Sequence, residues 1–109
     1  MISVKVFQTK DSQIRSFQLS GHAEYAEEGQ DIVCSAVSAL VINFINSLSM
    51  YTSQAFDTDS DELSGTIIVN FLSDLTHDGK LLVDSLLLGL RNIENDYNGQ
   101  YIHVDFREV

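Results

Sequence analysis

Two long segments whose apolar residues recur at steps of three and four constrain the fold of this chain more than any other feature. The first covers residues 32–52 and the second about 78–97. This spacing puts apolar side chains on one face of a helix, where they can pack against another layer. The first stripe comprises Val33, Val37, Leu40, Val41, Phe44, Leu48 and Tyr51, and the second comprises Leu82, Val83, Leu86, Leu87, Leu90, Ile93 and Tyr97. Two helices are therefore predicted.

Short segments in which apolar and polar residues alternate surround the two helices, as is typical of half-buried strands. A polar cluster at residues 9–12 suits a hairpin turn between the first two of them. The predicted strands cover residues 2–8, 13–20, 54–61 (a short edge strand), 66–72 and 101–106. The order β-β-α-β-β-α-β indicates a single α+β domain over residues 1–109, with both helices laid over one mainly antiparallel sheet.

Charge and composition restrict the possible partners of the chain. It carries 16 acidic and 6 basic residues, a formal net charge of −10. This charge suits solubility; it also repels nucleic acid and anionic membranes and favours cationic partners. The longest apolar windows, 37–48 and 81–90, are interrupted by polar residues, so no membrane span is predicted. The first residues show no signal-peptide pattern and one cysteine allows no internal disulfide, so a cytoplasmic location is the default expectation.

Cys34 is the residue whose position is most suggestive of chemistry. If Asp31 is the N-cap of the first helix, Cys34 falls in the first turn, where backbone N–H groups lack partners within the helix. Those donors stabilise a thiolate and could also bind the oxyanion formed from a substrate carbonyl. The alternative is a buried structural thiol, which is the more frequent fate of a lone cysteine.

Four further residues surround this candidate nucleophile in the sequence. His22 begins a polar segment that we interpret as a loop, and its imidazole could take the thiol proton, or it could simply be exposed. Gly21 would let the backbone turn sharply before it. Asp31 could orient His22 or only cap the helix. Ser38 lies one turn after Cys34, so its hydroxyl either approaches the thiol or bonds to its own helix.

Metal binding is not predicted. Residues 57–61 begin like a calcium loop, but Glu62 stands where glycine is required and Ile68 where a bidentate acid is required. We interpret this acidic run as a solvated turn. One cysteine and three scattered histidines give no zinc spacing, and His77 and His103 have no setting that suggests chemistry.

The segment 21–38 carries a more specific signal. It reads Gly21-His22-Ala23, a short loop ending in Gly29, one residue, and then Asp31-Ile32-Val33-Cys34, followed by small residues and Ser38. This pattern closely resembles the signature of the ribosomal-processing cysteine proteases of Firmicutes and related bacteria, the Prp family. The resemblance extends over the full length of the chain and its order of strands and helices.

The resemblance implies that His22 and Cys34 are the catalytic pair, with Asp31 and Ser38 as further motif positions. It also implies a homodimer in which a flexible loop covers the active site, and Gly21 and Gly29 would be the natural hinges of that loop. The implied substrate is large-subunit ribosomal protein number twenty-seven, whose N-terminal extension is removed after a Phe-Phe-type sequence. No cofactor is implied. A basic ribosomal protein also fits the acidic charge of the chain.

Two other functions remain compatible with the residues. One is a non-catalytic ribosome-assembly dimer that holds a basic peptide without cutting it. The other is a thiol redox sensor, because Cys34 would be an accessible thiol without an internal resolving partner.

Overall fold

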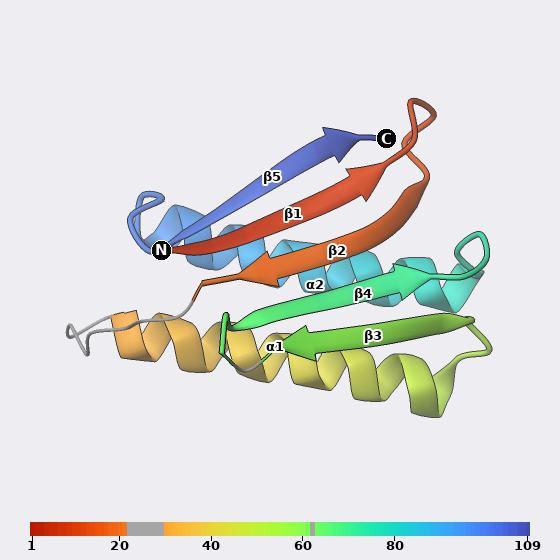
Figure 1. Cartoon of the computed structure of the whole chain (residues 1–109), viewed down its shortest axis with the longest axis horizontal. Helices are drawn as coiled ribbons and strands as arrows, with labels where there is room; N and C mark the ends of the chain where they lie inside the picture. Colours follow the sequence, from red (N-terminus) through yellow and green to blue (C-terminus); the bar gives the residue numbers. More distant parts are fainter. Residues whose placement is uncertain (22–29, 62) are drawn as a thin grey trace.

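The strands and helices follow one another in the predicted order β-β-α-β-β-α-β, which confirms the α+β class (Figure 1). A computed structural model describes residues 1–21, 30–61 and 63–109, and at residues 30 and 31 only the backbone. The elements are β1 (Ile2–Gln8), β2 (Ile14–Ser20), α1 (Gln30–Tyr51), β3 (Phe56–Asp61), β4 (Thr66–Phe71), α2 (His77–Asp96) and β5 (Ile102–Glu108).

The five strands of the described chain form one sheet in the order β3-β4-β2-β1-β5. Neighbouring strands are antiparallel except β1 and β5, which run parallel. Both helices lie on the same side of the sheet (Figure 1). The β1–β2 hairpin closes as predicted, with Ser12 at φ 63° and its N–H donating to the Thr9 carbonyl at 2.9 Å.

The core lies between the helices and one face of the sheet, because alternate strand residues point toward the helices. Val4 and Val6 of β1 are fully buried, and Phe17 of β2 is 1% exposed. The Phe17 ring meets Phe44 of α1 and Phe71 of β4 edge-on, with ring centroids 5.8 and 5.7 Å apart. These contacts fix α1 against the centre of the sheet.

The start of α1 differs from the prediction. The helix begins at Gln30, so Asp31 is its second residue and does not precede it, and Cys34 is the fifth residue and not the third. The assignment of Asp31 as N-cap is therefore wrong. Polar residues such as glutamine and aspartate cost little in helix propensity, so the residue types at positions 30 and 31 do not stop the helix from extending toward the N-terminus.

The second helix ends and begins close to the predicted residues. Thr76 is its N-cap, and its hydroxyl accepts a hydrogen bond from the Gly79 N–H at 3.0 Å. Beyond the C-terminus, Asn98 and Gly99 adopt φ values of 55° and 70°, the left-handed conformation that ends many helices.

The acidic run 57–61 is a strand and not the solvated turn that we predicted. It forms most of β3, which pairs with β4 and so confirms the predicted edge strand. Pairing with the apolar strand β4 supplies backbone hydrogen bonds to a sequence of low strand propensity, so tertiary context overrides local preference.

Residues Ile32–Tyr51 of α1 reach a mean hydropathy of 1.8 and would be long and apolar enough to cross a membrane by length and composition alone. Core helices also meet this criterion. In the fold, Val33, Val37, Val41, Phe44 and Leu48 of α1 are buried in the core.

Candidate active site

An open groove of about 360 Å³ lies between the first half of α1 and the sheet. It brings together three of the residues singled out in the sequence, Gly21, Cys34 and Ser38. Among the described residues, the lining consists of Ile2, Leu19, Gly21, Cys34, Val37, Ser38, Val41, Ser60, Asp61, Gly65, Thr66 and Ile67.

Helical geometry turns Cys34 toward this groove. Val33 and Val37 are buried against the sheet, and this fixes the rotation of α1 about its axis. Cys34 therefore lies at the margin of the buried stripe, where it is partly buried and packs against the core while still lining the groove. Ser38 lies one turn later on the same side and is exposed. Both positions line the groove, and the approach of the Ser38 hydroxyl to the thiol stays a prediction.

Gly21 occupies a position that only glycine adopts easily. It directly follows β2 and has φ +89°, in the left-handed region. A Cβ atom at this residue would collide with the carbonyl oxygen of Met1. The chain therefore leaves the sheet beside the start of β1 through a backbone conformation that most other residues would strain to adopt.

Three of the predicted positions cannot be placed. His22 and Gly29 lie outside the described residues, and so does the side chain of Asp31. The pairing of His22 with Cys34 and the orientation of His22 by Asp31 stay predictions.

The walls of the groove are mainly apolar. Ile2, Leu19 and Ile67 come from the sheet, and Val37 and Val41 from α1. Such a surface favours apolar side chains in a bound ligand, since their burial removes apolar area from water.

Sequence reasoning missed the contribution of the β3–β4 connection to the groove. Ser60, Asp61, Gly65 and Thr66 line one side of it. The Asp61 carboxylate also accepts a hydrogen bond from the N–H of Leu63 at 2.9 Å. The polar residues between two strands signalled a turn, but no local pattern shows that the turn faces the start of α1.

Two histidines lie away from the groove. His77 Nδ1 is 3.1 Å from Asp78 Oδ1, and His103 Nδ1 is 3.1 Å from Glu94 Oε2. Neither histidine is among the groove-lining residues. In the part of the chain that the structure describes, no group of three or more His, Cys, Asp or Glu residues could hold a metal ion.

The arrangement suits covalent chemistry on an extended ligand. A partly buried thiol faces a groove that is open to solvent, near the start of a helix whose first N–H groups have no partners within the helix. An apolar wall lies on one side of it, and the polar ends of β3 and β4, with Ser60 and Thr66, lie on another.

Comparison with known proteins gives one consistent result. The family model described as Cysteine protease Prp matches residues 1–103. The ribosomal processing cysteine protease Prp of Bacillus subtilis is 32% identical over 89% of this chain and 90% of its own length.

Solved structures agree with this match. An essential ribosomal processing protease Prp from S. aureus, in complex with a substrate peptide, superposes with a TM-score of 0.90 at 25% identity, covering 98% of this chain and 100% of the other. The same protease with a covalently linked product peptide gives a TM-score of 0.87 at 26% identity with the same coverage.

Proposed function

Because this chain belongs to the Prp family of cysteine proteases, we propose that it removes the N-terminal extension of large-subunit ribosomal protein number twenty-seven. The observation that carries the proposal is the position of Cys34, the only cysteine in the chain, which is partly buried and lines an open groove. The covalent product complex of the S. aureus relative supports an enzyme that forms a bond to its substrate.

In the proposed mechanism, His22 and Cys34 form the catalytic dyad. His22 takes the proton from Cys34 Sγ, and the thiolate attacks the carbonyl carbon of the scissile bond. Free N–H groups in the first turn of α1 stabilise the negative charge on the tetrahedral oxygen. His22 then protonates the departing amine, and water hydrolyses the thioester and regenerates the thiol.

The groove supports the proposed cleavage after a Phe-Phe-type sequence. Its apolar walls, formed by residues such as Leu19, Val41 and Ile67, can cover an aromatic side chain beside the thiol. Burying an aromatic ring of this size contributes about 2 kcal/mol to binding. The segment 21–31 would open and close over this site about Gly21 and Gly29, and such motion would gate access.

We further propose a homodimer that acts in the cytoplasm, where ribosomal proteins are synthesised. Exposed apolar side chains on α1 support the dimer, because Ile32, Ile42, Met50 and Tyr51 are each more than half exposed. A helix that is apolar beyond its core-facing stripe usually has a second surface to cover. Sedimentation of the purified protein at several concentrations tests this assembly, and a monomer throughout would contradict it.

Cleavage of a defined peptide tests the proposed function. The purified protein is incubated with a peptide that spans the extension junction of ribosomal protein number twenty-seven, and the products are identified by mass spectrometry. We expect a single cut after the aromatic pair. Cys34→Ser should abolish the cut while leaving the fold intact, and Ser35→Ala on the exposed side of the same helix turn should retain it.

The alternative functions predict other outcomes. A peptide-binding module would bind the peptide and leave it uncut by the unmodified protein. A redox sensor would cut nothing. Peptide turnover that persisted after alkylation of Cys34 would not depend on this thiol. Either result would exclude the protease mechanism described above.

A further inference from the structure

In the part of the chain that the structure describes, β3 forms an unpaired edge of the sheet. This strand is terminal in the strand order and pairs only with β4 among the described strands. An edge strand presents unpaired N–H and C=O groups, which can accept an extended peptide as an additional strand.

The open edge is continuous with the candidate active site. Ser60 and Asp61, at the end of β3, line the same groove as Cys34. From there β3 runs back along α1, and the two elements point in opposite directions (Figure 1). A peptide held at the thiol could therefore continue along the whole of β3.

The negative charge of this edge favours a basic segment as its occupant. Alternation along the strand places Asp57, Asp59 and Asp61 on the face that points away from the helices. Their cross-strand partners on β4 are Asn70, Ile68 and Thr66, none of which is basic. None of the three carboxylates forms an ion pair with another described residue.

A second copy of the chain is a poor occupant for the same reason. Two β3 strands paired edge to edge would bring six aspartates into one short ladder, and like charges opposite one another are destabilising. A basic strand would instead bring the Cβ atoms of its lysine or arginine residues to about 5 Å from those of the aspartates, which lets cation and carboxylate meet across the pair.

We propose that the β3 edge binds an extended basic segment of the substrate next to the scissile bond, by strand addition. Lysine or arginine at every second residue of that segment pairs with Asp57, Asp59 and Asp61. The inference rests on the proposed protease function and adds a binding surface outside the groove.

Reversing the charge of Asp59, at the middle of β3, tests whether electrostatic attraction holds the peptide at this edge. In a Cys34→Ser background, binding of the basic junction peptide is measured by fluorescence anisotropy. Asp59→Lys should raise the Kd about fivefold, because an exposed ion pair contributes up to about 1 kcal/mol and reversal adds repulsion. Asp96→Lys, at the exposed end of α2, changes the net charge equally and should leave the Kd within about twofold of the parent. Equal Kd values for both variants would overturn the proposal.

Alternate N-methylation of the peptide tests strand addition. In the basic flank, one peptide carries methyl groups on the odd amides and a second carries them on the even amides. Only one set of amides can face β3, so one peptide should bind about tenfold more weakly and the other like the parent. Equal effects of the two sets would rule out an added strand.

Turnover of a short peptide distinguishes a failure of the proposed β3 binding surface from a failure of the proposed protease function. If a peptide without the basic flank is cut by the native protein while neither test above shows a difference, the β3 surface is wrong and the protease function stands. If no peptide is cut, the proposed function itself fails.

Discussion

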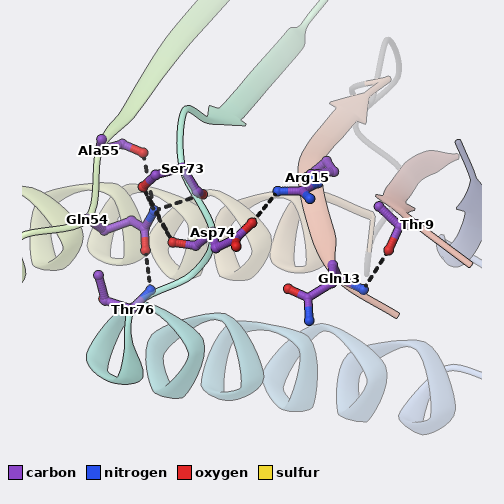
Figure 2. Close-up of polar contacts among 8 residues, drawn as sticks. All are labelled: Thr9, Gln13, Arg15, Gln54, Ala55, Ser73, Asp74 and Thr76. Carbon is purple, nitrogen blue, oxygen red and sulfur yellow. Dashed lines mark hydrogen bonds and ion pairs between the residues drawn. The ribbon is translucent and has the colours of Figure 1, made fainter. Parts of the chain in front are cut away.

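At the scale of single residues, Gln54 shows how a polar side chain can hold two elements together. It is the one polar side chain buried among the described residues, with 5% exposed. Its Oε1 accepts the Thr76 N–H at 2.7 Å, and its Nε2 is 3.2 Å from Ser73 Oγ and 3.3 Å from the Ala55 carbonyl (Figure 2). The segment after α1 is thereby tied to the turn before α2.

Gln54→Ala is predicted to lower the free energy of unfolding by about 2 kcal/mol, because several partly buried backbone groups would lose their partner. Urea denaturation followed by circular dichroism measures the change. Gln100→Ala removes an exposed amide of the same type and should change the free energy by less than about 0.5 kcal/mol. Equal effects of the two variants would show that the hydrogen bonds of the Gln54 side chain do not contribute to the stability of the fold.

The backbone at Gly21 allows a second comparison at this scale. Gly21→Ala adds a Cβ that collides with Met1 in addition to the cost of a positive φ. Gly99→Ala has φ +70° but open space around the new methyl group, so it carries only the second cost. Thermal unfolding should show a loss of about 1 kcal/mol for Gly99→Ala and clearly more for Gly21→Ala. A smaller loss at Gly21 would mean that the start of β1 moves aside freely.

At the scale of elements, α1 carries both the core and the candidate nucleophile. The residues of its core stripe recur at steps of three and four, and Leu48 is fully buried near the C-terminal end. Cys34 and Ser38 lie beside this stripe, so the packing of the stripe determines where the thiol points. Stability and site geometry therefore depend on the same helix face.

Substitutions on the two faces of α1 should therefore change the free energy of unfolding by different amounts. Leu48→Ala is expected to lower the free energy of unfolding by about 3 kcal/mol, because a fully buried side chain would leave a cavity. Met50→Ala lies two residues later on the exposed side and should cost less than about 0.5 kcal/mol in the monomer. Chemical denaturation of both variants at low protein concentration checks the difference.

At the scale of the whole molecule, the formal net charge of −10 sets the long-range field. Three of the acidic side chains are those of the edge strand β3, next to the groove. A field of this sign raises the encounter rate with cationic ligands and is screened by salt over about 10 Å at ordinary ionic strength.

Turnover should respond to salt in proportion to the charge of the substrate. Raising the salt from about 50 to about 300 mM is predicted to lower kcat/KM for a lysine-rich junction peptide about fivefold. A peptide with glutamine in place of lysine should change by less than about twofold. Parallel salt profiles for the two peptides would exclude electrostatic steering by the acidic surface.

Periodicity alone was sufficient to predict the element order and most of the core. The two apolar stripes and the alternating strands depend on local geometry, which each segment carries in its own residues. The motif around Cys34 was also visible, since the residue types and spacing of residues 21–38 are a property of the chain. Family membership followed from that motif and was confirmed by the comparisons.

The tertiary structure alone decided which distant segments meet. It set the first residue of α1 at Gln30, made a strand of the acidic run in β3, and brought Ser60, Asp61 and Thr66 to the groove opposite Cys34. These outcomes depend on strand order and on pairing with β4, which involve contacts between residues far apart in the sequence. Local patterns contain no information on such contacts, because the free energy that selects them arises only when the layers pack together.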